Sequence, residues 1–224
     1  MNAVSQRMIS FLRDLGKHNE REWFHANKER YNEAKNDFVS LVENLIGRIG
    51  EITDLGDLKA KDCMYRIQRD IRFSPDKTPY NTHFSVVISP GGKKTKHTPF
   101  FFRIKPTDPS ACIIGGGVWY GDGKQLASIR QEIDYNADQL LDIINQPEFK
   151  KYFDGLEGDK LKRPPKGYDA DHPHIELLKM KQWLVWRPIT EKEYTSEGFS
   201  DYVVDVYKTM TPFLNFWDQV LLEE

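Results

Sequence analysis

The middle third of the chain contains four short segments in which apolar and polar side chains alternate. The segments cover residues 64–73, 83–89, 100–105 and 111–120. Alternation with a period of two predicts β-strands, because successive side chains of a strand point to opposite faces of a sheet. The loops between the segments are of hairpin length, so we expect a mostly antiparallel sheet and not a parallel one. Three consecutive glycines, Gly115 to Gly117, interrupt the fourth segment and predict a bulge or a close approach of another backbone.

Helical periodicity characterises the N-terminal part of the chain. We expect a short helix over residues 5–15, ending before Gly16. A longer helix should begin at Asn19, which has the spacing of an N-cap residue with Glu22. Apolar residues recur along this helix at helical spacing as far as Ile49, which predicts one buried face.

The C-terminal part of the chain is also expected to be mostly helical. The apolar spacing predicts helices over residues 126–133 and 137–145 and a last helix over residues 200–222. Pro212 should kink or restart this last helix, because proline lacks the backbone donor for the preceding turn. Residues 183–189 are predicted to form a further strand.

Together these elements predict an α+β fold, in which a central, mostly antiparallel sheet packs with N- and C-terminal helices. A single domain is expected over residues 1–224. It would be helical at residues 1–58 and form the sheet at residues 59–120. Residues 121–224 would supply helices, a loop, a strand and the last helix.

Composition excludes several classes of protein. No run approaches the roughly 20 apolar residues of a membrane helix, and the first residues lack the apolar core of a secretory signal. Two cysteines, Cys63 and Cys112, are too few for a disulfide scaffold or a four-cysteine zinc site. We therefore expect a soluble, cytoplasmic protein. The sequence indicates no cofactor, and it decides neither for nor against enzymatic activity.

Positive charge is concentrated in one part of the chain. The formal net charge is −2, yet residues 59–105 hold 11 Lys and Arg against 3 Asp and Glu, and the rest holds 21 against 31. One basic segment in an acidic chain predicts a local anion site rather than a surface that is basic throughout. Lys93, Lys94 and Lys96 have a simpler interpretation, since they fall at a predicted hairpin tip and can be merely solvated there.

The densest group of charged residues follows the first predicted strand. If residues 64–73 form a strand, Arg66, Asp70 and Arg72 point to one face, spaced about 7 Å apart at every second residue. One carboxylate would then leave one guanidinium unpaired, and arginine binds phosphate or carboxylate in a bidentate manner. Further cationic candidates for the same ligand-binding site are Lys77 in the following turn and Arg103 and Lys105 on a neighbouring strand.

Three residues near this group are candidates for proton transfer, namely Asp70, Tyr80 and His83. An alternative interpretation stays open, in which the arginines and Asp70 form a structural ion-pair network that satisfies its own charges. Arg69 falls on the otherwise apolar face of the predicted strand and needs a partner or a route to solvent.

A second group of candidates lies in residues 155–174, which are rich in Gly, Pro and charge and predict a long loop. If this loop folds over the sheet, Arg163 and Lys166 would contact a ligand; otherwise it is a surface crossover. His172 and His174 are metal ligands in type, but their spacing matches no established site, so no metal is predicted.

Residues 66–80, with the sequence RIQRDIRFSPDKTPY, resemble the run that marks a widespread family described only as a domain of unknown function. Supporting matches are residues 19–24, the three glycines at 115–117, residues 129–130 and residues 161–168. One departure is Asn81, where many relatives are expected to have lysine, and it slightly lowers the local positive charge. The resemblance covers nearly the whole chain. It implies one intact domain and no particular reaction, substrate or cofactor.

Three functions remain open at this point. The first is binding of a small anionic ligand, phosphorylated or carboxylated, at a cationic sheet face, with or without catalysis. The second is a nucleic-acid-binding module in which Phe100, Phe101 and Phe102 could stack on bases, although core packing explains these residues better. The third is a structural or protein-interaction domain. The oligomeric state is left undetermined.

Overall fold

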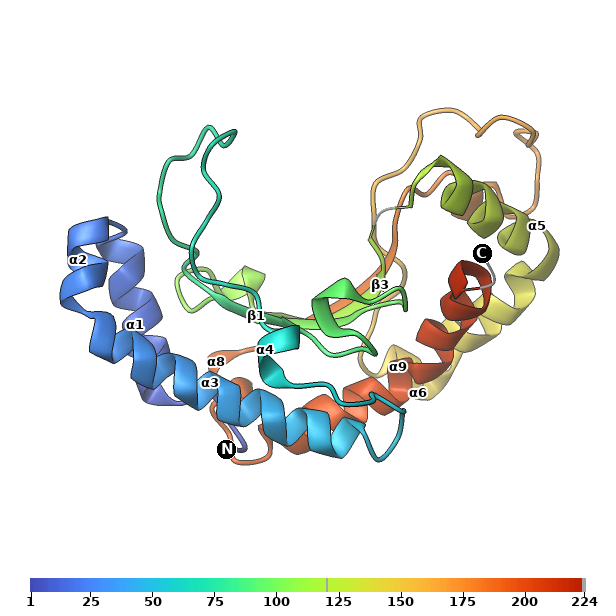
Figure 1. Ribbon diagram of the computed structural model, residues 1–224. Helices are drawn as coiled ribbons and strands as arrows, with labels where there is room; N and C mark the ends of the chain where they lie inside the picture. The colour runs from blue at the N-terminus through green and yellow to red at the C-terminus, as the bar shows by residue number, and fades with distance from the viewer. Residues whose placement is uncertain (120, 223–224) are drawn as a thin grey trace. The chain divides into compact units, whose positions relative to one another are not determined.

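The computed structural model describes residues 1–119 and 121–222 and confirms the α+β class (Figure 1). Its four strands form one antiparallel sheet in the order β1-β2-β3-β4. They are β1 (Phe84–Val87), β2 (Phe100–Ile104), β3 (Ile113–Val118) and β4 (Trp183–Pro188). Each strand coincides with a predicted segment. Tyr120, at the end of one predicted segment, lies outside the described residues.

The chain divides into two compact units, and each is built from segments far apart in the sequence. The first unit comprises Met1–Lys94, Phe101–Ile114 and Pro188–Asp205. The second unit comprises Thr95–Phe100, Gly115–Arg187 and Val206–Glu224. Because no unit is a continuous stretch of chain, the core of each depends on contacts between residues distant in sequence.

The first unit is mainly helical around β1. Its helices are α1 (Gln6–Lys17), α2 (Arg21–Ala26), α3 (Lys28–Ile49), α4 (Ala60–Cys63) and α8 (Glu191–Tyr194), with single 3₁₀ turns at Gly92–Lys94 and Pro109–Ala111. The Ser5 side chain accepts from the Met8 N–H and caps α1. The apolar face of α3 is buried as expected. Its Phe38 ring stacks on Phe84 of β1 and meets Phe102 of β2 edge to face.

The prediction that Asn19 caps the second helix is wrong. Glu20 is the N-cap residue of α2, and Asn27 separates α2 from α3. Asn19 instead pairs with the backbone of Tyr80, donating from its amide nitrogen to the carbonyl oxygen (2.9 Å) and accepting from the N–H (3.1 Å). The Asn19 side chain thus satisfies both backbone hydrogen-bonding groups of Tyr80, as a neighbouring strand would. The Tyr80 ring stacks on Phe24, with ring centroids 4.0 Å apart.

The predicted strand over residues 64–73 is also wrong. Only isolated bridges occur there, one at Met64 and one at Gln68. Residues 69–79, here called the 69–79 loop, project from the unit as an irregular hairpin (teal in Figure 1). The physical reason is that the Arg69 side chain bonds to groups inside the loop, and two prolines in it lack donors for a ladder.

The second unit contains α5 (Gly123–Asn145), α6 (Pro147–Lys150), α7 (Ile175–Leu178) and most of α9 (Phe199–Leu222). Two helices were predicted in place of α5, and its backbone is indeed non-helical at Asn136, between them. Helix α9 continues through Pro212 as a single element. Within the described part of the chain, no helix has the length and apolar character needed to cross a bilayer.

Candidate anion-binding site

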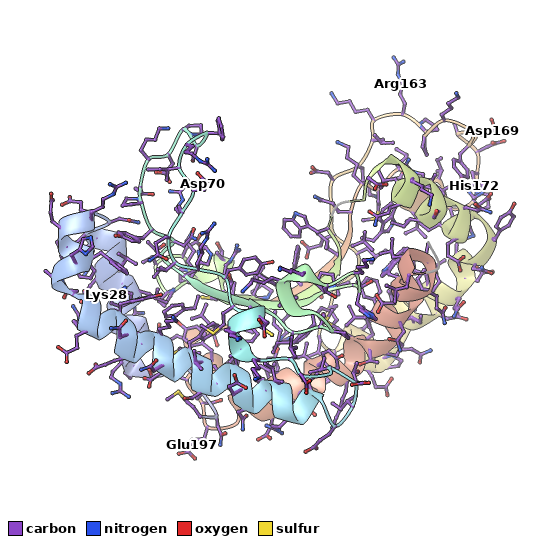
Figure 2. All side chains as sticks on the ribbon, viewed as in Figure 1. Lys28, Asp70, Arg163, Asp169, His172 and Glu197 are labelled. Carbon is purple, nitrogen blue, oxygen red and sulfur yellow. The ribbon has the colours of Figure 1, made fainter. Side chains whose placement is uncertain are left out.

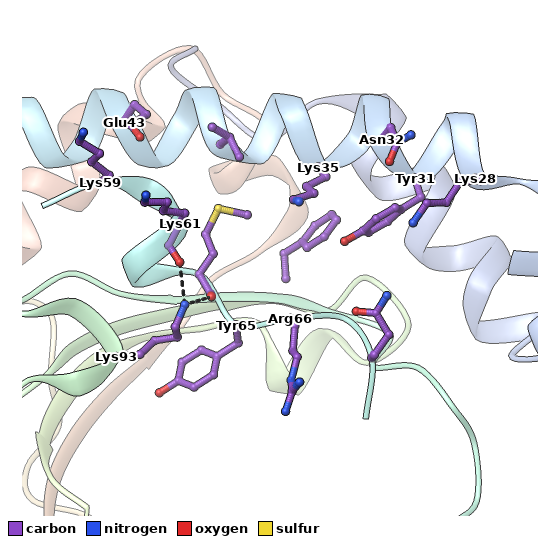
Figure 3. Close-up of a pocket in the computed structure, with 14 residues that line it drawn as sticks. Lys28, Tyr31, Asn32, Lys35, Glu43, Lys59, Lys61, Tyr65, Arg66 and Lys93 are labelled. Carbon is purple, nitrogen blue, oxygen red and sulfur yellow. Dashed lines mark hydrogen bonds between the residues drawn. The ribbon is translucent and has the colours of Figure 1, made fainter. Parts of the chain in front are cut away.

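A groove of about 740 Å³ lies between α3 and residues 59–68 of the first unit and is here called the basic groove (Figure 3). Six cationic side chains line it, against one carboxylate, that of Glu43. All six are exposed to solvent. They are Lys28, Lys35, Lys59, Lys61, Arg66 and Lys93.

One wall of the basic groove is a stripe along α3. Lys28, Asn32, Lys35, Val39 and Glu43 line the groove, and their spacing of three or four residues places them on one helix face. At a rise of about 1.5 Å per residue, this stripe is about 22 Å long. The adjoining face of α3 carries the buried apolar residues, and its packing against the core holds the helix with this stripe along the groove.

The other wall is held in place by two charged side chains. Glu43 accepts a hydrogen bond from the Ala60 N–H at the start of α4 (2.8 Å). The Lys93 amine donates to the carbonyl oxygens of Lys61 (2.7 Å) and Met64 (2.5 Å), as Figure 3 shows. Lys93 therefore has a specific structural contact and is not merely a solvated tip residue. The only carboxylate of the groove lining is likewise bonded to the protein backbone.

Four cations of the groove remain without such contacts. Lys35, Lys59, Lys61 and Arg66 make no ion pair and no side-chain hydrogen bond with any residue that the structure describes. Lys28 lies over the Tyr31 ring, 4.7 Å from its centroid, in a cation–π contact that keeps its charge. The groove thus presents several charges of one sign, and these four cations form no ion pair with any carboxylate among the described residues.

A second hollow, of about 460 Å³, shares Tyr65, Arg66 and Gln68 with the basic groove. It brings together three residues singled out in the sequence, namely Arg66, Asp70 and His83. Burial, reinforced by the positive charges of Arg103 and Lys105, lowers the pKa of His83 to about 4. His83 is therefore a neutral imidazole at physiological pH.

The low pKa of His83 leads to a prediction about stability. The unfolded chain protonates this imidazole near pH 6.5, whereas the folded protein resists protonation until about pH 4. Between these values the unfolded state binds more protons. The free energy of unfolding contributed by His83 should therefore be constant above about pH 6.5 and fall as the pH is lowered toward 4. Urea denaturation at about pH 7.5 and about pH 5 measures how much the free energy of unfolding falls between the two pH values. This fall should be smaller in His83→Gln than in the wild type. If the variant lost as much stability between the two pH values as the wild type, His83 would not have the low pKa described above.

The remaining candidates of the first unit are engaged by the protein. Asp70 accepts two hydrogen bonds from the Arg72 guanidinium (2.9 and 2.6 Å), which lowers the pKa of the carboxyl group. Lys77 donates to a backbone carbonyl within the same loop, and Tyr80 is buried. The Arg103 Nε donates to the carbonyl of the 109–111 turn (2.9 Å). Because residues 64–73 are not a strand, Arg66 and Arg72 do not share a sheet face; Arg66 lines both of the hollows described here.

The other candidates lie in the second unit. Arg163 and Lys166 are exposed on the 155–174 segment, which is largely irregular as predicted (Figure 2 labels Arg163). Nearby, the His172 Nδ1 accepts from the His174 N–H (3.1 Å), so its Nε2 carries the proton that is donated to Asp134 (2.9 Å). Within the described ranges, no group of His, Cys, Asp and Glu is placed to hold a metal ion.

Neither cysteine has the exposure or the low pKa of a reactive thiol. Both Cys63 and Cys112 are buried free thiols. Burial raises the pKa of Cys63 to about 12 and also raises that of Cys112. A thiol nucleophile requires the deprotonated form at neutral pH, so the structure gives no support for one here.

The sequence-based candidates omitted most of the groove. Lys28 and Lys35 look like an ordinary solvated helix face, and the signal that could have found them is their seven-residue spacing on the polar stripe of α3. Lys59 and Lys61 fall inside the basic segment but have no recognisable motif. Phe100 and Phe102, considered as stacking residues, are fully buried in the core, whereas Phe101 lines the second hollow.

Comparisons with known proteins add one finding. The profile of one family matches residues 7–216, which include parts of both units, and its description reads "Conserved hypothetical protein (DUF2461)". The match confirms the resemblance to a conserved family of unknown function. No curated protein and no solved structure matches the chain.

Proposed function

The chain belongs to the DUF2461 family, whose description names no activity, and we propose from the geometry that it binds a multiply charged anion in the basic groove. One observation carries the proposal: six cationic side chains line one hollow, and its single carboxylate is bonded to the backbone of α4. A ligand rich in phosphate or carboxylate would supply the missing negative charge.

The spacing of the cations indicates what kind of anion fits. Lys28 and Lys35 are seven residues apart on α3, which corresponds to about 10 Å along the helix axis. Four further cations, Lys59, Lys61, Arg66 and Lys93, line the same groove. The arrangement therefore favours a ligand that carries several anionic groups in a row. Lysine suits this role, because its flexible stem brings a point charge to any phosphate oxygen.

Binding explains the groove better than catalysis does. Among the described residues that line it, no histidine is present, and burial raises the pKa of Tyr65, so its phenol stays protonated. His83, in the adjoining hollow, is a weak base with a pKa of about 4. General acid–base catalysis at neutral pH needs a group whose pKa lies near 7. We further propose a cytoplasmic location, which agrees with two reduced cysteines.

Thermal unfolding tests the proposal with simple anions. Orthophosphate, pyrophosphate and tripolyphosphate should raise the melting temperature in that order, because a ligand that binds only the folded state stabilises it. If several lysines bind one ligand together, the increase in melting temperature should be larger for ligands with more phosphates. Sodium chloride at matched ionic strength is the control. Equal melting temperatures in chloride and in all three phosphates would refute anion binding in the groove.

A further inference from the structure

The 69–79 loop is held in shape by hydrogen bonds among its own charged and polar side chains. The Arg69 guanidinium donates to Asp76 (2.6 Å), to Ser74 (3.2 Å) and to Thr78. Asp76 also accepts from the Thr78 N–H (2.9 Å), and the Lys77 amine donates to a carbonyl across the loop. These bonds fix the shape of a segment that has little core of its own.

An aromatic ring is what this loop displays. Phe73 is 94% exposed, the highest value among the large exposed hydrophobic residues of the described chain. The Arg72 guanidinium lies 5.9 Å from its ring centroid and leaves the rest of the ring uncovered. Isolated exposed hydrophobic residues are common, but a fully exposed ring on a fixed loop beside a cation is a binding surface for another π-system.

A second exposed ring stands at the base of the same loop. Tyr65 is 46% exposed and lines both the basic groove and the adjoining hollow, next to Arg66. Its position places an aromatic face within the row of cations. The first unit thus combines a groove lined by six cationic side chains with two accessible rings, Tyr65 and Phe73.

This combination favours one chemical class of ligand. Single-stranded nucleic acid carries a phosphate at every step and offers an unpaired base that can stack on an aromatic ring. Inorganic polyphosphate would use the lysines but not the rings. A duplex would hide the faces of its bases, so the rings could not stack on them.

We infer that the basic groove binds single-stranded nucleic acid. Lys28, Lys35, Lys59 and Lys61 hold the phosphates, a base stacks on Tyr65 beside Arg66, and Phe73 on the braced loop receives a further base. This inference rests on the proposed function, since it names the ligand class of the same groove.

Fluorescence anisotropy with a labelled oligothymidylate of about ten nucleotides tests the inference, with inorganic polyphosphate of similar charge as competitor. The Tyr65→Ala and Phe73→Ala variants should each weaken oligonucleotide binding by between about 5-fold and 100-fold, and Phe73→Ala, on the 69–79 loop, should leave polyphosphate binding unchanged. Tyr65→Phe, which keeps the ring, should restore affinity. Tyr135→Ala is the matched control, since Tyr135 is 74% exposed and belongs to the second unit.

The outcomes distinguish failure of the nucleic-acid inference from failure of the proposed anion binding in the basic groove. If polyphosphate binds while the ring variants leave oligonucleotide affinity unchanged, the inference is overturned and the anion site stands. Duplex binding as tight as single-strand binding also overturns the inference. If neither polyphosphate nor oligonucleotide binds at about 50 mM salt, the proposed function fails as well.

Discussion

Reversing three charges in the basic groove, with K35E, K59E and K61E combined, is expected to weaken tripolyphosphate binding by at least about 100-fold at low salt. The variant removes three cations that face the ligand and adds three carboxylates that repel it. Folding should be preserved, because these side chains are exposed and make no ion pair with any described residue. Isothermal titration calorimetry measures the affinity, and a thermal melt verifies the fold.

A matched variant separates the groove from the charge of the whole protein. K150E, K181E and K208E combined change the net charge by the same amount at exposed lysines of the second unit. This control should bind tripolyphosphate within about threefold of the wild type, because screened charges outside the site contribute little. Equal losses in both triple variants would mean that only the overall field of the protein attracts the anion, contrary to the proposal.

The largest effect on stability is expected from Gly115→Ala in β3. A Cβ atom at Gly115 would lie 2.0 Å from the Val185 carbonyl oxygen and 2.9 Å from the Trp186 Cα. Both are backbone atoms of β4, so no side chain can rotate away to make room. We expect a loss of about 3 kcal/mol or more in the free energy of unfolding, or failure to fold. Urea denaturation followed by circular dichroism measures it.

Gly47→Ala is the control for this substitution. Gly47 lies in α3, and an added Cβ would meet nothing within 4 Å. Alanine is a better helix former than glycine, so this variant should be more stable than the wild type by about 0.5–1 kcal/mol. If Gly115→Ala lowers the free energy of unfolding and Gly47→Ala raises it, the close backbone packing at β3 is established. A Gly115→Ala protein as stable as the wild type would refute it.

The regular elements of the fold could be predicted because their periodicity is set by local burial. Strand β2 buries every second residue and the buried face of α3 follows helical spacing, whereas all of β1 and the first three residues of β4 are buried. The three glycines of β3 predicted a close approach of another backbone, and at Gly115 the backbone of Val185 does approach closely. The short helices α4, α7 and α8 were not predicted, since four residues are too few to show a period.

The 69–79 loop could not be predicted by the same reasoning. Ile71 and Phe73 alternate with charged residues as a strand would, yet Phe73 is almost fully exposed. Arg69 was the informative exception, because it fell on the apolar side of the predicted strand and needed a partner. It finds that partner in Asp76, seven residues along the chain, and the bond closes a loop instead of joining a ladder.

The candidate site was predicted in part. Arg66 and part of the basic segment line the basic groove, and Asp70 and His83 line the adjoining hollow. The lysines of α3 were missed because the groove arises from packing of α3 against residues 59–68. That contact joins positions about 20 to 40 apart in sequence, and no local pattern encodes it.

Nuclear magnetic resonance tests the central claim most directly, by mapping tripolyphosphate onto the ¹H–¹⁵N spectrum of the labelled protein. Anion binding in the basic groove predicts that the largest shift changes occur at the amides of Lys35, Lys59, Lys61 and Arg66 and saturate together. Changes confined to the 155–174 segment or to the 69–79 loop, with these four amides unmoved, would contradict it.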